Sequence, residues 1–399
     1  MSRAVAFLFA TVFLDMLSFG IVAPVLPKLV LSFTGGDTAR AAAIFGTFGT
    51  VFALMQFLCA PLLGALSDRF GRRPVIVLSN LGLGLDFVVM ALAPTLGWLF
   101  AGRVLAGITS ANLTTANAYV ADVASPDERA GAFGVLGAAF GLGFIAGPAI
   151  GGLLGSVHAR LPFWSAAALG VINAGYGLCV LPESLPRERR MPLALRRINP
   201  FGALALLCSR NGLLALSTIA FVSILAGTVL QSIYVLDVSR RFGWDDRIVG
   251  LSLAAVGICS ALVQVALMKP AIKRLGERGT MVCGLAGGAA GMAIFAIAPS
   301  GPTFALGIPL MALWGLAPAA AQATMTRHVG PSEQGALQGA ITSLGALAAI
   351  GGPLLFAMIY ARSLGPAPWN VAGAGWLLAT AMLAAAACLA ARMPEPRTV

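Results

Sequence analysis

Apolar stretches of about twenty residues recur along the whole chain and are separated by short polar segments. Each stretch is long enough to cross a hydrocarbon core of about 30 Å. Because backbone polar groups in lipid must pair within their own segment, the stretches are predicted to be helices. The pattern therefore predicts an all-α membrane protein with twelve transmembrane helices, near residues 4–27, 41–66, 74–94, 97–121, 131–155, 161–181, 211–236, 246–269, 279–299, 302–325, 335–360 and 368–391.

The composition supports a surface that faces lipid. Hydrophobic residues make up 58% of the chain and charged residues only 10%. A soluble domain usually carries about 25% charged residues, so a water-soluble fold of this length would lack the polar residues to cover its surface.

The net charge of +11 does not require a nucleic-acid partner, because the basic residues are distributed along the chain as in a membrane protein. With the N-terminus placed in the cytoplasm, 18 Lys and Arg residues fall on the cytoplasmic side, 7 fall outside and Arg103 lies within a stretch. This bias follows the positive-inside rule and predicts that both termini are cytoplasmic.

The chain repeats itself at one fixed offset. Gly71 and Gly276 follow the second and eighth stretches, and Pro148 and Pro353 lie in the fifth and eleventh; both pairs differ by 205 positions. The repeat predicts two pseudo-symmetric six-helix bundles, with a substrate site between them near mid-membrane. The predicted domains are an N-terminal bundle (1–181), a cytoplasmic linker (182–210) and a C-terminal bundle (211–399).

The loop GALSDRFGRRPV, after the second stretch, combines glycines, an acid and three arginines. One hypothesis is a cytoplasmic latch that breaks and re-forms during transport. An ordinary positive-inside hairpin would account for the same residues. The predicted latch consists of Gly64, Asp68, Arg69, Gly71, Arg72 and Arg73.

Three charged residues lie well inside predicted helices, away from their ends: Asp15, Asp86 and Arg103. Intramembrane charges are costly and often functional, so these residues are candidates for proton coupling. The alternatives are a structural pair, for instance between an aspartate and Arg103, and snorkelling of Arg103 to the outer surface.

The fifth stretch is rich in small residues, which allow another helix to approach closely. Its proline removes one helix hydrogen bond and can kink the helix. The predicted gate helix is centred on Gly147, Pro148, Gly151 and Gly152, and tight packing would explain these residues equally well.

Isolated polar residues within the stretches are candidates to line a substrate cavity. Individually, each is more often an interhelical hydrogen-bonding residue. The candidates are Gln56, Asn112, Asn117, Gln231, Tyr234 and Gln264. The sequence carries no nucleotide-binding loop, metal-ligand cluster or catalytic triad, so we expect a protein that is not an enzyme and has no cofactor or metal.

Together these motifs resemble the major facilitator superfamily. The loop GALSDRFGRRPV, the segment RVLAGITSAN around Arg103 and the segment GFIAGPAIGG are similar to family motifs. FLDMLSFGIVAPVLP, GLGLDF and EQGALQG resemble the tetracycline/proton antiporter subgroup. The resemblance implies transport roles for Asp15, Gln56, Asp68, Arg72, Asp86 and Arg103.

The chain departs from that subgroup in its C-terminal half. Proton-coupled members carry an acid in the ninth helix and a histidine in the eighth, and the matching positions here are Gly288 and Ser260. Two functions therefore stay open. The first is proton-coupled efflux of a small amphipathic drug-like compound by alternating access, as in a tetracycline-like antiporter. The alternative is a carrier of a metabolite or lipid-like solute with different or no proton coupling.

The resemblance also implies a setting and a set of partners. We expect a monomer in a bacterial inner membrane, whose partners are a small-molecule substrate, protons and the lipid bilayer, with no nucleic acid.

Overall fold

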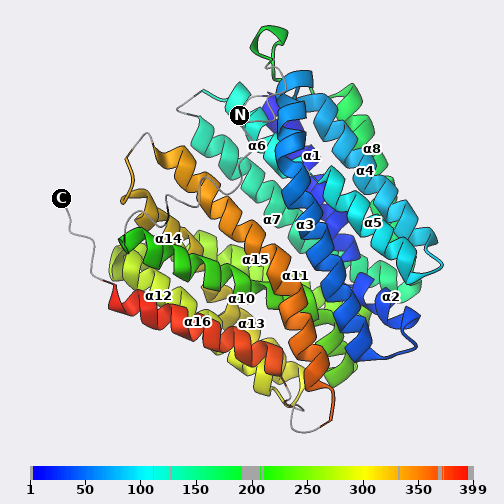
Figure 1. The fold of residues 1–399 in the computed structure, drawn as a ribbon, viewed down its shortest axis with the longest axis vertical. Helices are drawn as coiled ribbons and strands as arrows, with labels where there is room; N and C mark the ends of the chain where they lie inside the picture. Colours follow the sequence, from blue (N-terminus) through cyan, green and yellow to red (C-terminus); the bar gives the residue numbers. More distant parts are fainter. Residues whose placement is uncertain are drawn as a thin grey trace. The chain divides into compact units, whose positions relative to one another are not determined.

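The structure, a computed structural model, is helical, and no strand occurs in the ranges that it describes. Those ranges are 3–110, 112–125, 128–190, 207, 211–330, 333–366, 371 and 373–393. In the first half of the chain (Figure 1) the elements are α1 (Arg3–Val22), α2 (Leu26–Phe33), α3 (Thr38–Phe70), α4 (Arg72–Leu92), α5 (Leu96–Thr109), α6 (Asn112–Val123), α7 (Arg129–Val157), α8 (Leu161–Cys179) and the 3₁₀ turn η1 (Arg187–Arg189). The second half contains α10 (Asn211–Phe242), α11 (Asp246–Leu262), the π-helical η3 (Val263–Leu267), α12 (Met268–Ile297), α13 (Gly301–Ala312), the 3₁₀ turn η4 (Leu313–Gly315), α14 (Leu316–Thr326), α15 (Gln334–Ser363) and α16 (Ala374–Arg392).

The helical prediction is confirmed, and nine helical segments of the described chain are long and apolar enough to cross a membrane. Some predicted stretches are divided or fused. The stretch 97–121 is covered by α5 and α6, and one helical segment from Asp246 to Ile297 spans two predicted stretches. The number of twelve crossings remains a prediction.

The chain forms two compact units. Unit 1 contains residues Met1–Gly36, Val51–Ile198 and Trp244–Ala254, and unit 2 contains Asp37–Thr50, Asn199–Gly243 and Ala255–Val399. Each unit thus includes one short segment from the opposite half of the sequence. The predicted boundary at residues 182–210 remains a prediction, because only 182–190 and Leu207 of that linker lie within the described residues.

Each of the two copies of the repeated loop contains a glycine with an uncommon backbone conformation. Gly71 has φ of 109° and Gly276, 205 positions later, has φ of 68°. Residues with a Cβ rarely adopt positive φ angles, so glycine allows the chain to turn between two helices. At Gly276 the turn interrupts α12, which is otherwise continuous.

Two arginines that are 205 positions apart make equivalent contacts in the two units. The Arg73 guanidinium donates to the carbonyl oxygens of Gly177 and Leu178 at the end of α8. The Arg278 guanidinium donates to the carbonyl of Ala391 at the end of α16. Cations at helix C-termini satisfy orphan carbonyls and complement the helix dipole. The sequence repeat therefore corresponds to a repeated contact in three dimensions.

The small residues of α7 pack against the backbone of other helices. A Cβ on Gly147 would lie 2.6 Å from the Cα of Gly20, and one on Gly151 would clash with the backbone of Ile21. Gly152 faces the backbone of Asp246 and Gly250 in the same unit. Pro148 lies inside α7, which continues through it as one helix. The gating role predicted for these residues stays a prediction, and their close packing is a feature of unit 1.

Gly151→Ala is expected to destabilise unit 1 by about 1–3 kcal/mol, because the added methyl has no space beside Ile21. Gly141→Ala, in the same helix, is the matched control. A Cβ there meets no atom within 4 Å, and alanine favours a helix over glycine by up to about 1 kcal/mol. Thermal unfolding of the purified variants in detergent measures both effects. Equal melting temperatures for the two variants would contradict the packing argument.

Candidate functional site

Polar side chains of unit 1 gather where the predicted 97–121 helix is broken. The residue after α5 is Ser110, with φ of −77° and ψ of 76°, and α6 begins at Asn112. The Gln56 side-chain amide donates to the Ser110 hydroxyl at 3.0 Å. Non-helical backbone inside a membrane needs such polar partners or a water-lined surface, so this break marks a candidate site.

Asn112 connects three helices at this break. Its Nδ2 donates to Asp15 Oδ1 of α1 at 2.9 Å and to Asn80 Oδ1 of α4 at 2.6 Å. Asp15 is only 6% exposed and Asn80 only 1%. The Nδ2 of Asn80 and the Oδ1 of Asn112 are buried and have no hydrogen-bond partner among the described residues. A polar solute or a water molecule would find one unused donor and one unused acceptor beside the carboxyl group of Asp15.

The second acid, Asp86, forms an ion pair with Arg103. The guanidinium of Arg103 on α5 donates to Asp86 Oδ2 on α4 and lies 5.8 Å from the ring centroid of Phe52. Asp86 is completely buried and Arg103 is 7% exposed. Arg103 is therefore paired inside the protein, and the snorkelling alternative does not apply. Gly102 makes room for the pair, because a Cβ there would lie 2.5 Å from Asp86 Oδ1.

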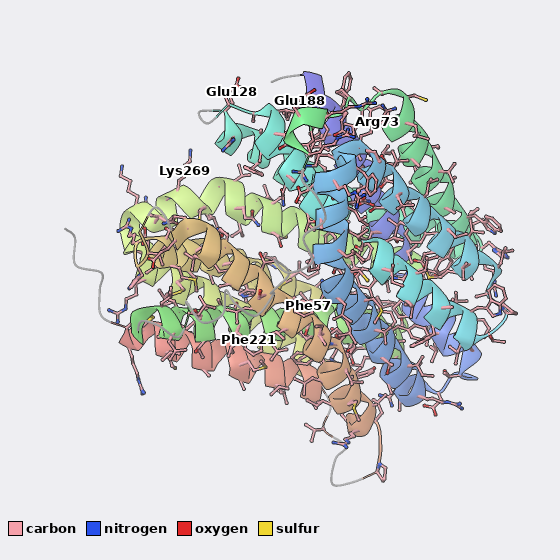
Figure 2. All side chains as sticks on the ribbon, turned by 45° about the horizontal axis from the view of Figure 1, so that its top comes forward. Phe57, Arg73, Glu128, Glu188, Phe221 and Lys269 are labelled. Atoms are coloured by element: carbon pink, nitrogen blue, oxygen red, sulfur yellow. The ribbon has the colours of Figure 1, made fainter. Side chains whose placement is uncertain are left out.

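The predicted latch residues lie at one end of unit 1, and Figure 2 shows Arg73 at the same end as Glu128 and Glu188. Arg72 pairs with Asp68 at 2.5 Å and with Asp122 at 3.0 Å. Arg69 is exposed and lies over the ring of Phe70. A Cβ on Gly64 meets no atom within 4 Å, so packing does not require glycine there, whereas Gly71 has a positive φ of 109°.

Two acids of this network were not predicted: Asp122 and Glu183. Asp122 lies at the end of α6, and Glu183 Oε1 accepts from the backbone N–H of Arg72 at 2.8 Å, at the start of α4. A carboxylate at a helix N-terminus is favoured by the helix dipole. The available signal was that both acids follow long apolar stretches on the predicted cytoplasmic side.

Unit 2 contains the counterpart of the Arg72–Asp122 pair with reversed charges. Glu277 lies 205 positions after Arg72, and Arg327 lies 205 positions after Asp122. Arg327 Nη2 pairs with Glu277 Oε1 at 2.7 Å. Each unit thus has an ion pair at the equivalent positions, and the cation and the anion are exchanged between the two units.

This reversal predicts that the charges in unit 1 are exchangeable. Asp122→Arg alone should cost about 2 kcal/mol, since it removes a charged hydrogen bond and places two cations together. The double variant Arg72→Asp/Asp122→Arg should regain at least half of that loss when all variants also carry Asp68→Asn, which removes the second carboxylate that pairs with Arg72 and would repel the introduced aspartate. A double-mutant cycle on thermal unfolding measures the coupling. Additive losses in the double variant would contradict the interpretation.

The remaining cavity candidates lie in different environments. Asn117 and Gln231 are exposed, and Gln264 is exposed in η3 beside Gly315. The prediction that Tyr234 lines a cavity is corrected by the structure, because this side chain is completely buried. Its ring packs edge-on against Phe295, Phe304 and Trp376 of unit 2.

A buried acid of unit 2, Asp237, was missed. The predicted helix ended at residue 236, but α10 continues to Phe242 and Asp237 is buried within it. Its Oδ2 accepts from Trp376 Nε1 at 2.8 Å and pairs with Arg241 at 3.1 Å. Arg241 also donates to the carbonyls of Phe295 and Ala298 at the end of α12, so this pair anchors two helices. The spacing of four residues between Asp237 and Arg241 was the signal for a helical ion pair.

The position matching the subgroup's C-terminal acid is filled by a neighbour. A Cβ on Gly288 would lie 2.8 Å from the Cβ of Trp314. The Trp314 indole donates to Ser223 at 2.7 Å and lies over Gly227. An acidic side chain at position 288 would have to displace this tryptophan.

Comparisons with known proteins agree with this architecture. A sequence model described as Major Facilitator Superfamily matches residues 8–222 and 216–399. The class C tetracycline resistance protein of Escherichia coli is 41% identical over 382 residues, covering 96% of this chain and 94% of that protein. The class G protein of Vibrio anguillarum is 37% identical over 367 residues, covering 91% and 90%.

Solved structures resemble the chain over almost its whole length. The human organic anion transporter MFSD10 (TETRAN) is 26% identical with a TM-score of 0.71, covering 98% of this chain and 100% of that one. The nucleoside transporter NupG has a TM-score of 0.76 at 16% identity, covers 98% of this chain and 100% of its own, and supports the fold alone. With the helical repeat, the repeated arginine contacts and the family match over both halves, the chain belongs to the Major Facilitator Superfamily.

Proposed function

We propose that this multi-pass membrane protein is a proton-coupled exporter of a small amphipathic drug, with a tetracycline-like compound as its substrate class. The relatives named as tetracycline resistance proteins support this substrate class. The observation that carries the proposal is the buried cluster of Asp15, Asn112 and Asn80 at the broken helix of unit 1.

Asp15 is the better placed of the two acids to exchange a proton. Its only hydrogen-bond partner among the described residues outside its own helix is the neutral Asn112, and it has no ion pair there. Protonation of Asp15 therefore breaks no salt bridge. The free donor of Asn80 and the free acceptor of Asn112 are the groups that would bind a polar edge of the substrate next to it. Competition between proton and substrate at this cluster would couple their movements.

Asp86 and Arg103 have a supporting role in this proposal. Their ion pair joins α4 to α5, about two helical turns before the break, and so restrains the segment that leads to Ser110 and Asn112. Protonation of Asp86 would release Arg103, and a buried cation without a partner is costly. The pair is thus suited to two discrete arrangements, as alternating access requires.

We place the protein in a bacterial inner membrane with both termini in the cytoplasm, from the distribution of basic residues and the bacterial relatives. It would act as a monomer, without metal or cofactor, on a small molecule and protons. The latch, gate and cavity residues named above keep their proposed roles within this cycle, apart from Tyr234.

The test uses everted membrane vesicles from a strain that produces the protein. Respiration establishes an acid-inside pH gradient that quenches a fluorescent amine, and addition of tetracycline is expected to release protons from the vesicles and restore fluorescence. Vesicles without the protein are the control. A panel of drug susceptibilities in the same strain should show raised tolerance to amphipathic drugs. Unchanged tolerance and no proton release for any compound of the panel would contradict the proposal.

A second candidate, a carrier of a metabolite or lipid-like solute with different or no proton coupling, is favoured by one observation. Trp314 fills the place beside Gly288 where the related antiporters carry an acid. Uptake of a solute that persists after the pH gradient is collapsed would support this candidate.

A further inference from the structure

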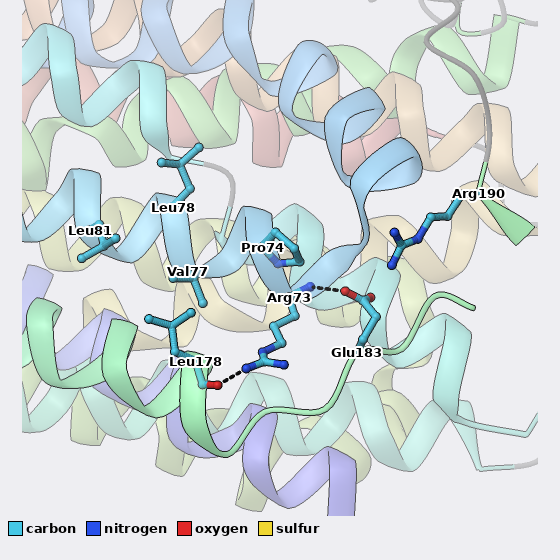
Figure 3. A pocket seen from close by; sticks show the side chains of 8 residues that line it. All are labelled: Arg73, Pro74, Val77, Leu78, Leu81, Leu178, Glu183 and Arg190. Atoms are coloured by element: carbon cyan, nitrogen blue, oxygen red, sulfur yellow. Dashed lines mark hydrogen bonds between the residues drawn. The ribbon is translucent and has the colours of Figure 1, made fainter. Parts of the chain in front are cut away.

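A cavity of about 610 Å³ opens on unit 1, away from the Asp15 cluster. It lies between α4, α8 and the segment after α8 (Figure 3). These two helices pack along each other. The side chains that line the cavity are Arg73, Pro74, Val77, Leu78, Leu81, Leu178, Glu183 and Arg190.

One end of the cavity is apolar and open. Leu78 is 54% exposed, Leu81 44% and Leu178 53%. Leu78 and Leu81 belong to a helix that is long and apolar enough to cross a membrane. Exposed leucines on such a helix face hydrocarbon chains, so this end of the cavity suits an extended acyl chain.

The other end is charged, with two cations and one anion. The Glu183 carboxylate is already occupied, because it accepts from the backbone N–H groups of Arg72, Arg73 and Leu185. The Arg73 guanidinium donates to the neutral carbonyls of Gly177 and Leu178, and within the described ranges it forms no ion pair that would neutralise it. The Nε of Arg190 is buried and has no hydrogen-bond partner in the part of the chain that the structure describes. Figure 3 shows the Arg190 guanidinium turned toward Glu183. The charged end is therefore positive overall and has an unused donor.

We propose that this cavity binds one anionic phospholipid, with its phosphate on Arg190 and an acyl chain along Leu78, Leu81 and Leu178. Guanidinium groups bind phosphate through paired hydrogen bonds, and the helix ends beside it place the site at the level of the lipid headgroups. The site would attach the segment after α8 to the membrane surface through a lipid. It does not depend on the transported substrate.

The test measures lipid binding to the full-length protein in a neutral detergent by native mass spectrometry. Phosphatidylglycerol is titrated against phosphatidylcholine of the same chains. The wild-type protein should bind phosphatidylglycerol at least about fivefold more tightly, as expected for one additional interfacial cation. Arg190→Gln should reduce phosphatidylglycerol binding to the level of phosphatidylcholine. Leu78→Trp, which fills the apolar end, should weaken binding of both lipids.

Arg187→Gln is the matched control, because Arg187 lies in the same segment, is exposed and does not line the cavity. It should leave binding unchanged. Equal affinities for the two lipids in the wild-type protein would overturn the proposal. An equal loss in Arg187→Gln would show general surface attraction instead, displacement by millimolar inorganic phosphate would show a free-anion site, and displacement by tetracycline would show a drug site. Each of these three outcomes would also overturn it.

Discussion

Asp15→Asn is expected to abolish proton release on addition of drug, down to the level of vesicles without the protein. The amide is nearly the same size as the carboxyl group and keeps an oxygen that can accept from Asn112 at 2.9 Å. The change removes the ability to bind and release a proton and little else. Substrate binding should persist, because the free donor of Asn80 and the free acceptor of Asn112 remain. The variant should therefore bind drug without exchanging it for protons.

Fluorescence recovery in everted vesicles measures the proton movement, and tryptophan quenching of the purified protein measures drug binding. Glu188→Gln is the control, because Glu188 is an exposed acid in η1. Normal proton release in Asp15→Asn, at wild-type protein levels, would remove Asp15 from the coupling mechanism.

Arg103→Gln is expected to destabilise unit 1 by about 3–5 kcal/mol, because it leaves the carboxylate of Asp86 buried without its cation. The double variant Asp86→Asn/Arg103→Gln carries no charge at this place. It should unfold within about 1–2 kcal/mol of the wild-type protein, since removal of both partners avoids the unpaired buried charge. Both variants should fail to transport, because the proposed switch between two arrangements depends on the ion pair.

Thermal unfolding in detergent and transport in vesicles separate the two roles of this pair. A double variant that is stable and transports normally would show that the pair is structural only. A double variant as unstable as Arg103→Gln would show that shape and packing at Gly102 matter more than charge.

The sequence predicted the features that depend on chain-wide patterns. The hydrophobic stretches predicted the helices, because a membrane requires both length and internal backbone pairing. The offset of 205 predicted a structural repeat, and Arg73 and Arg278 make matching contacts at this offset. The candidates Asp15, Gln56 and Asn112 are brought together at one broken helix.

The features that depend on packing were harder to predict from the sequence. Asp237 was missed because hydrophobicity does not mark where a helix ends, and α10 continues six residues beyond the expected boundary at 236. Tyr234 was assigned to a cavity because the sequence cannot distinguish a face covered by other aromatic rings from an open one. The filling of the Gly288 position by Trp314 is a contact between distant elements, and no local pattern encodes it.

The reversed polarity of the Arg72–Asp122 and Glu277–Arg327 pairs bears on how this protein arose. Copying of one ancestral segment would have produced the same sign at both places. A change of one partner at a time passes through a stage with two like charges or a single unmatched one in contact, which weakens the fold. Reversing such a pair without loss of stability therefore needs a neutral intermediate or both changes together. What the two halves share is an attraction between two helical segments, and the positions of the cation and the anion are exchanged between them.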